Sequence, residues 1–276
     1  MFAADSSDSN GDRLLRTTDG GKYWQPVGRM PNKAFLHFVS MNEAFAGNEH
    51  STDGGRTWSK LPIPTHTKGY AYFHDKDHGW AAAEENKKLL IKRTVDGGKT
   101  WKIVMSRDTI APLNNAVIRS AGLNDAWVEC LGDVGMSQQG FALYHTADGG
   151  KTWYPVIVNS TAGGGPAPGF PLNDHTGPIL NSYAGHLDVV STKVAFMSGY
   201  CPACDNGNNI GWTTDGKTWT NSKQMYSGYG GSYPAFADDK HGWWICTDNL
   251  SPSVLYTTSD GGHTWQKAHT FDKPKN

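Results

Sequence analysis

Short apolar segments recur in pairs along this chain, with polar residues between them. In five places an aromatic residue that follows Ala or Gly stands seven residues after an earlier position, which is apolar in four of the five. The pairs are Phe38 and Phe45, Phe73 and Trp80, Ser120 and Trp127, Val189 and Phe196, and Phe236 and Trp243. Two short apolar segments around a polar turn are typical of paired antiparallel strands. Helical periodicity is nowhere sustained, so the pattern predicts an all-β chain.

A heptad built on Asp-Gly-Gly is the second repeated element. It occurs six times, and the fifth copy is one glycine short. The heptads end at Trp24, Trp58, Trp101, Trp153, Trp219 and Trp265, and their aspartates are Asp19, Asp53, Asp96, Asp148, Asp215 and Asp260. In a tight turn the carboxylate accepts backbone N–H groups while the glycines take positive φ without a Cβ clash. We therefore expect these aspartates to be structural.

The two elements together define a repeat of four strands. Six repeats in 276 residues give about 46 residues per unit, close to the roughly 40–50 of a propeller blade. We predict a six-bladed β-propeller of four-stranded antiparallel blades, forming one domain over residues 1–276. The approximate blades are 271–276 with 1–27, 34–60, 70–104, 116–158, 186–222 and 234–268. A seventh blade between residues 154 and 185 is the alternative, although neither element recurs there.

The chain ends suggest how the ring closes. Residues 1–4 resemble the second strand of a blade that lacks its first strand, and Phe271-Asp272-Lys273 resembles Phe73-His74-Asp75. If counting continues from the last residue, Asn276, to Met1, then Phe2 stands seven residues after Phe271. We predict that residues 271–276 pair with the N-terminal strand and leave few free sheet edges.

Composition narrows the class of protein. The 33 glycines and 18% charged residues suit many tight turns, and a net charge of −1 without a basic stripe argues against nucleic acid as a partner. No apolar run reaches membrane-spanning length. We expect a monomer without a cofactor, secreted or extracytoplasmic, whose signal peptide has been removed before Met1.

The heptads resemble the BNR or Asp-box repeat, Ser/Thr-x-Asp-x-Gly-x-Thr-Trp, of bacterial sialidases, xyloglucan-active tandem propellers and sortilin-type receptors. The added elements His78-Gly79-Trp80-Ala81 and His241-Gly242-Trp243-Trp244 are most similar to the repeats of photosystem II stability and assembly factor-like proteins. The resemblance spans almost the whole chain. It implies a propeller whose Asp boxes are hairpins on the face opposite the ligand.

The eleven tryptophans fit this architecture better than a row of sugar platforms. Six close Asp boxes, and Trp80, Trp127 and Trp243 take the blade-core position, which leaves Trp212 and Trp244 unassigned. If the resemblance to sialidases extended to the site, three arginines from well-separated blades would bind the carboxylate of the substrate. All seven arginines lie at or before Arg119, so we expect no classical sialidase site.

Three long, aromatic connections lie on the face opposite the Asp boxes, at residues 159–185, 199–209 and 223–233. Long loops commonly carry function, and residues 226–233 have the Tyr/Ser/Gly composition of recognition surfaces. The candidate ligand-binding residues, in these loops or at the mouth of the channel, are Tyr70, Asn115, His186, Tyr200, Tyr226, Tyr229, Tyr233 and His269. The alternative is that they are solvated rim residues. We expect a ligand-binding or assembly-scaffold propeller with a glycan or protein ligand.

A carbohydrate-active hydrolase or lyase is the second hypothesis. Its carboxylates would be among those on the loop face, which are Asp108, Asp133, Asp174, Asp205 and Asp248. Asp174 with His175 is the best acid/base candidate, and Asp248 is a second carboxylate. A glycosidase needs two carboxyls roughly 5–9.5 Å apart. A loop carboxylate in an Asx turn is the simpler interpretation for any one of them.

The four cysteines include one close pair, Cys201-Pro202-Ala203-Cys204. The spacing fits half of a redox or zinc site, but no second pair completes a tetrahedral ligand set, so we expect no metal. A local disulfide is the first hypothesis, and a bridge to Cys246 is the second. Cys130 and Cys246 fit buried strand thiols.

Overall fold

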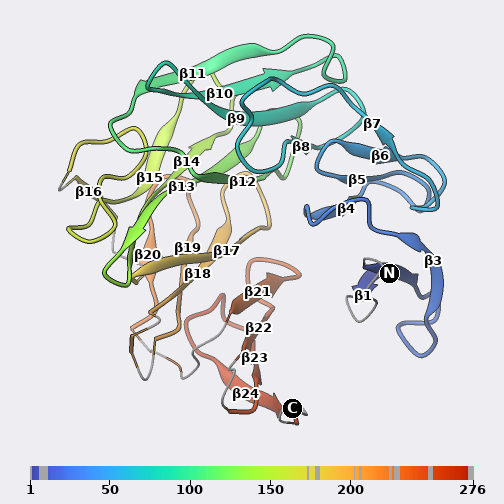
Figure 1. Ribbon diagram of the computed structural model, residues 1–276. Helices are drawn as coiled ribbons and strands as arrows, with labels where there is room; N and C mark the ends of the chain where they lie inside the picture. Colours follow the sequence, from blue (N-terminus) through green and yellow to red (C-terminus); the bar gives the residue numbers. More distant parts are fainter. Residues whose placement is uncertain are drawn as a thin grey trace.

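The computed structural model describes residues 2–5, 12–172, 174–177, 181–201, 203–204, 207–223, 226, 231–247 and 251–272. These residues form twenty-four strands in six antiparallel sheets, each sheet built from consecutive strands (Figure 1). No helix in this part of the chain is long and apolar enough to cross a membrane.

The sheets are numbered here as blades 1 to 6. Blade 1 contains β1 (Phe2–Asp5), β2 (Arg13–Arg16) and β3 (Gln25–Arg29). Blade 2 contains β4 (Leu36–Phe38), β5 (Ala44–Ala46), β6 (Glu49–Ser51) and β7 (Ser59–Lys60). Blade 3 contains β8 (Tyr72–Phe73), β9 (Gly79–Glu85), β10 (Lys88–Thr94) and β11 (Lys102–Asp108).

The second half of the chain forms three further blades. Blade 4 contains β12 (Asn115–Arg119), β13 (Ala126–Gly135), β14 (Gln138–Thr146), β15 (Tyr154–Asn159) and β16 (His175–Thr176). Blade 5 contains β17 (Tyr183–Val189), β18 (Ala195–Tyr200), β19 (Asn209–Thr213) and β20 (Thr220–Asn221). Blade 6 contains β21 (Ser232–Phe236), β22 (Gly242–Cys246), β23 (Val254–Thr258) and β24 (Gln266–Thr270).

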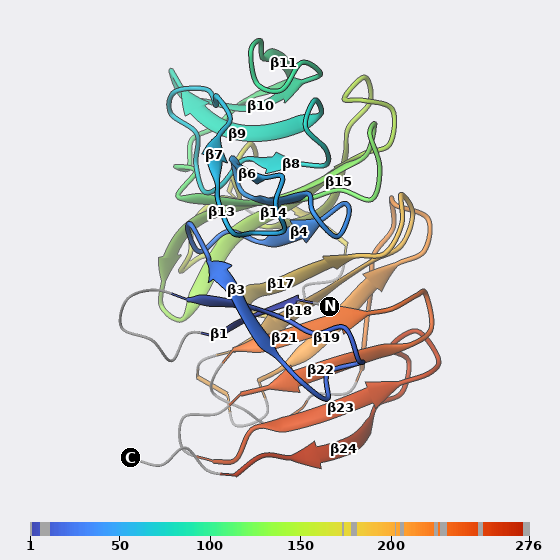
Figure 2. The ribbon, with the colours of Figure 1, turned by 90° about the vertical axis from the view of Figure 1, so that its right-hand side faces the viewer.

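The blades stand around a common centre, with β4, β8, β12, β17 and β21 innermost (Figure 1). Figures 1 and 2 both place blade 1 between blades 2 and 6. The prediction of an all-β, six-bladed propeller is therefore confirmed. Among the described residues of 154–185 the strands β15 and β16 belong to blade 4, so the alternative of a seventh blade there is not realised.

The predicted closing strand is not found among the described residues. Blade 1 has three strands there, and residues 273–276 lie outside the described part of the chain. Phe271 continues blade 6 instead, because its N–H donates to the carbonyl oxygen of Ser253 at 2.9 Å, next to the pairing of β24 with β23. Phe271, the first residue of the expected closing strand, thus lies at the outer edge of blade 6.

The apolar core is divided into layers between neighbouring blades. One cluster joins blades 3 and 4 and includes Trp80 and Tyr144, and a second joins blades 4 and 5 and includes Trp127 and Leu187. A third joins blades 5 and 6, where Phe196 and Phe236 stack with ring centroids 3.4 Å apart. Because each pair of neighbouring blades forms its own apolar layer, a long chain can bury its apolar residues in several small cores instead of one large core.

The two adjacent tryptophans of blade 6 correct the sequence assignment. Trp243 was expected in the blade core but is 46% exposed, whereas the unassigned Trp244 is fully buried. Trp80 packs edge-on against Trp153 of blade 4, with ring centroids 6.0 Å apart, so this position faces the following blade. Trp243 occupies the same position in blade 6 and points away from blade 5, while Trp244 packs into the cluster shared with blade 5. Alternation along a strand places the two on opposite faces.

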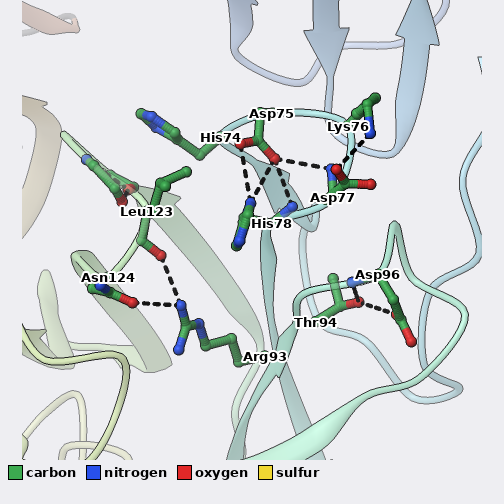
Figure 3. A network of polar contacts seen from close by, with 12 residues as sticks. His74, Asp75, Lys76, Asp77, His78, Arg93, Thr94, Asp96, Leu123 and Asn124 are labelled. Atoms are coloured by element: carbon green, nitrogen blue, oxygen red, sulfur yellow. Dashed lines mark hydrogen bonds and ion pairs between the residues drawn. The ribbon is translucent and has the colours of Figure 1, made fainter.

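Each Asp box is a turn held by its own side chains. In blade 3 the Asp96 carboxylate accepts the Thr94 hydroxyl at 2.8 Å (Figure 3). It also accepts the Thr100 N–H at 2.9 Å, and Gly98 N–H donates to Thr94 Oγ1 at 2.9 Å. Gly98 has φ +86°, a conformation that favours glycine. The hydroxyl of Thr100 and then its N–H lower the pKa of Asp96 to about 2. The carboxylate is fully used by the turn, as expected for a structural residue.

Candidate binding pocket at the centre of the propeller

A cavity of about 620 Å³ lies where the inner strands meet. Its lining residues come from β4, β8, β12, β17 and β21 and from the segments beside them. Five blades therefore contribute to one pocket. Concave sites of this size, lined by rings and a few polar groups, are typical of ligand pockets.

Five of the predicted ligand-binding residues line this pocket together: Tyr70, Asn115, His186, Tyr200 and Tyr233. The rings of His186 and Tyr233 lie against each other with centroids 4.4 Å apart. Burial lowers the pKa of His186, with the positive charge of Arg119 adding to the effect, so its imidazole is neutral at pH 7. A ligand-binding role for these five residues remains a prediction, but the structure does bring them to one place.

Two further candidates, His269 and Tyr226, lie elsewhere in the fold. His269 lies on β24, the outermost strand of blade 6, opposite Leu255, so its predicted place at the mouth of the channel is wrong. Tyr226 packs edge-on against Trp244 and Tyr256, with centroids 5.0 and 4.8 Å away, within the apolar layer between blades 5 and 6. Tyr229 lies outside the described residues.

Two of the three catalytic candidates lie within the described residues. Asp174 and His175 are at the outer edge of blade 4, where His175 pairs with Asn159 and the carbonyl of Asp174 accepts the Ser160 N–H at 3.3 Å. Neither lines the pocket. Asp248 lies outside the described residues, as does Asp205.

The long connection that carries Asp174 packs against blades 3 and 4. The Tyr144 hydroxyl donates to the carbonyl of Pro168 at 2.8 Å, and Arg107 Nε donates to the carbonyl of Gly169 at 3.1 Å. Phe170 lies beneath the Arg107 guanidinium at 4.3 Å. This part of the loop therefore covers the core instead of projecting toward the channel.

A disulfide joins Cys201 and Cys204. Cys201 N–H donates to the carbonyl of Gly207 at 2.9 Å, so the bridge sits inside a closed turn. Cys130 and Cys246 are buried free thiols, and burial raises the pKa of Cys246 to about 12. Across the described residues no group of three or more potential metal ligands comes together.

The main feature that sequence reasoning missed is a charge at the pocket wall. The Arg119 guanidinium lies 4.0 Å from the ring centroid of Phe35, and its Nη1 donates to the carbonyl of Ile118 at 2.9 Å. Both residues line the pocket. Burial lowers the pKa of Arg119, yet an arginine remains charged in proteins.

Glu129 lines the same pocket and was also missed. It is 1% exposed, and its Oε1 has no hydrogen-bond partner. Burial raises the pKa of Glu129 to about 8, so the carboxyl group is mostly protonated at pH 7. The signal in the sequence was a single acid inside the otherwise apolar run Ala126 to Leu131. A charged residue type in a buried strand marks a functional candidate.

Two further titratable rings at the pocket, Tyr72 and His37, have pKa values that favour their neutral forms. Tyr72 donates its hydroxyl to the carbonyl of Ser120 at 3.1 Å, and burial raises its pKa to about 12. His37 Nε2 lies 3.2 Å from the carbonyl oxygen of His74, and burial lowers the pKa of His37. The site therefore combines several rings, one buried arginine and one buried carboxyl group. Lys33 also lines the pocket, but its side chain is largely exposed and pairs with Asp12 at 2.9 Å.

Comparison with known proteins fits this architecture. The BNR/Asp-box repeat family matches residues 49–60, the second Asp box with its flanking strands. The chain therefore contains a BNR/Asp-box repeat at these residues. A Paenibacillus sp xyloglucanase is 24% identical over 277 residues, which is 88% of this chain and 26% of that protein. The photosystem II assembly lipoprotein Ycf48 of Synechococcus sp. (strain CC9902) is 26% identical over 133 residues, 41% of this chain and 39% of that protein.

A solved structure supports the fold independently. The chain of Ycf48 bound to D1 peptide aligns with a TM-score of 0.50 at 18% identity, covering 93% of this protein and 76% of that chain. This likeness concerns the fold. The chain spans about a quarter of the xyloglucanase and two fifths of the Ycf48 lipoprotein.

Proposed function

We propose that this protein is a non-catalytic, extracytoplasmic propeller that binds a segment of a partner protein in its central pocket. The observation that carries the proposal is the 620 Å³ pocket, which five blades line and to which four of them contribute tyrosine, histidine or phenylalanine rings. Tyrosines supply large contact areas at low cost in side-chain entropy, which suits the recognition of a peptide.

The related fold supports a peptide as the ligand class. Ycf48 has been solved with a D1 peptide, and its fold is similar to that of this chain. A propeller of this type can therefore present a peptide site. We transfer only the class of ligand to this chain, because binding residues depend on the site and not on the fold.

A glycoside hydrolase is the competing function, since one relative is a xyloglucanase. Hydrolysis needs two carboxyl groups on either side of the glycosidic bond. Among the described residues that line the pocket, Glu129 is the single acid. Asp174 lies at the outer edge of blade 4, so it does not supply the second one. This arrangement favours binding over hydrolysis.

The disulfide between Cys201 and Cys204 supports the extracytoplasmic assignment. Structural disulfides persist in oxidising compartments and are rare where thiols are kept reduced. Localisation of the tagged full-length protein in its native cell, before and after removal of any leader, tests this part of the proposal.

The binding part is tested with an array of overlapping peptides and, in parallel, a panel of polysaccharides with product detection. We expect saturable peptide binding that is lost when His186 and Tyr233 are both replaced by Ala. Tyr23→Ala is the matched control, because Tyr23 is an exposed tyrosine in the first Asp box and does not line the pocket. Release of sugar products that Asp174→Asn abolishes contradicts the proposal.

A further inference from the structure

We propose that the central pocket binds a carboxylate group of its ligand, with the Arg119 guanidinium as the ion-pair partner and Glu129 as a hydrogen-bonding neighbour. The inference rests on the proposed binding function and names the chemistry that the pocket recognises. It begins from the two polar groups that the fold buries at the pocket without pairing them with each other.

Strand geometry places Arg119 and Glu129 on one side of blade 4. In β12, Val117 and Arg119 are two residues apart and therefore share a face. In the neighbouring strand β13, Glu129 lies directly opposite Val117. Cross-strand partners project to the same side of a sheet. Ala116 and Ile118, on the other face, pack into the core shared with blade 3.

Arg119 is held in place but has no acid as a partner. Phe35 supports its guanidinium from one side at 4.0 Å, and its one hydrogen bond within the described part of the chain goes to the Ile118 carbonyl. No carboxylate of the described residues lies within ion-pair distance of it. The nearby carboxylate of Asp188 accepts the Phe236 N–H at 2.6 Å. The guanidinium has five N–H donors, so most of them are available to a ligand.

Glu129 supplies the complementary part of the site. Its Oε1 is buried without a partner, so in the described structure this oxygen has lost the hydrogen bonds that water would give it. With a pKa raised to about 8 by burial, the carboxyl group carries a proton at pH 7 and can donate it in a hydrogen bond to an anionic oxygen. A bound carboxylate would satisfy Glu129 and neutralise Arg119 together.

The charge balance selects a carboxylate over other ions. A ligand cation would be repelled by Arg119, since no ionised acid of the described residues pairs with it. A phosphate dianion would need a second cation, and the other cation at the pocket, Lys33, is already paired with Asp12 at 2.9 Å. A planar carboxylate carries one charge and matches the fork of the guanidinium.

A ligand carboxylate could belong to a peptide or to an acidic sugar, and matched probes distinguish these sources. We would measure binding of N-acetylphenylalanine and of its amide, of galacturonic acid and of galactose, and of inorganic phosphate by isothermal titration calorimetry. The expected result is about tenfold tighter binding of an acid than of its uncharged partner, corresponding to one charge-assisted hydrogen bond. Preference for galacturonic acid alone would retain the carboxylate site and contradict the peptide function.

Two variants assign the preference to Arg119. Arg119→Gln should bind acid and amide equally, and Arg119→Lys should keep part of the preference because it keeps the charge. Arg107→Gln is the matched control, because Arg107 lies over Phe170 at 4.3 Å as Arg119 does over Phe35, yet does not line the pocket. Each variant is used only if its thermal unfolding shows a folded protein. The inference is wrong if the wild-type protein binds no acid probe, if it binds acid and amide alike, or if folded Arg119→Gln keeps the preference.

The pH dependence isolates Glu129. Raising the pH from 7 to 9 removes its proton and should weaken binding of N-acetylphenylalanine several-fold, because the ionised form repels the ligand. Arg119 and the Cys130 thiol interact electrostatically with Glu129, and Arg119 also interacts with Asp188, His186 and Tyr72. Burial raises the pKa of Cys130. The pKa of His186 is lowered and that of Tyr72 is raised to about 12, so neither changes charge between pH 7 and 9. Glu129→Gln should remove the dependence; an unchanged dependence in this variant contradicts the role of Glu129.

Discussion

His145 Nδ1 lies 2.7 Å from the carbonyl oxygen of Gly216 and joins blade 4 to the Asp box of blade 5. Arg93 makes the same connection one blade earlier, since its Nη1 donates to the carbonyl of Gly149 at 3.3 Å. Both residues directly precede an Asp-box threonine. Nη2 of Arg93 also donates to Leu123 O at 3.0 Å and Asn124 Oδ1 at 2.7 Å (Figure 3). The Asp boxes thus serve as attachment points between blades.

The contact with His145 also explains why Gly216 is retained in the shortened heptad. Gly216 has φ +73°, and a Cβ there would lie 2.7 Å from the imidazole of His145. Any other residue would need both a strained backbone and movement of a buried ring. The blade interface therefore fixes one glycine of this box, although the second one of the usual pair is missing.

His145→Ala should lower the free energy of unfolding by about 3–5 kcal/mol. The substitution leaves Asp125, which lies 3.0 Å from His145 Nε2, buried without its partner. It also removes the ring stacked on Trp127 at a centroid distance of 3.8 Å. Urea unfolding measures the loss. His241→Ala is the control, because the side chains of His241 and of its partner Asp238 are 57% and 52% exposed and the pair should contribute little. A loss below 1 kcal/mol for His145→Ala contradicts the proposed connection.

Trp244→Ala and Trp243→Ala should differ strongly although the residues are adjacent. Trp244 is fully buried and donates its indole N–H to Ser232 Oγ at 2.7 Å, so its removal should cost about 3–5 kcal/mol. Trp243 is 46% exposed, and its removal should cost about 1 kcal/mol. Thermal and urea unfolding of both variants test the difference. Equal losses would mean that another surface covers Trp243 in solution.

The same pair of tryptophans shows how far the sequence could predict the structure. The heptads determined the number of blades and the role of the Asp boxes, because a tight turn with its side-chain acceptors is a local structure. How far Trp243 is buried depends on the residues that pack against the outer side of blade 6. These residues are distant in sequence, so the local sequence around Trp243 does not predict its exposure. The contact of Arg119 with Phe35 likewise joins residues in blades 2 and 4 that approach each other only after the ring has formed.

The stability of the protein should fall as the pH decreases from about 4 to 2. The hydroxyls of Thr57, Thr100 and Thr152, followed by their N–H groups, lower the pKa of Asp53, Asp96 and Asp148 to about 2. A lowered native pKa stabilises the fold above the unfolded value of 3.8, and this contribution disappears as the pH falls through the native value. Urea unfolding between pH 6 and pH 2 measures it.

A variant with Val at all three threonines provides the control. Without the hydroxyls, the pKa values of Asp53, Asp96 and Asp148 should rise toward 3.8. The triple variant should therefore be less stable at pH 6 and should lose less stability between pH 4 and pH 2. An acid dependence as steep as that of the wild-type protein would show that other carboxylates cause it.

The disulfide between Cys201 and Cys204 should order its loop without determining the fold. Because it closes a very short loop, the chain-entropy estimate for its removal is below the ~3 kcal/mol expected for a fifteen-residue loop. Replacing both cysteines with Ser should leave a folded propeller whose urea midpoint falls slightly and whose segment 199–209 is cleaved faster by protease. Cys130→Ala, at a buried free thiol, is the control that should leave the rate of cleavage in this segment unchanged.

Thiol titration of the unfolded, unreduced wild-type protein should detect two thiols, from Cys130 and Cys246. Four reactive thiols would show that this bridge does not form.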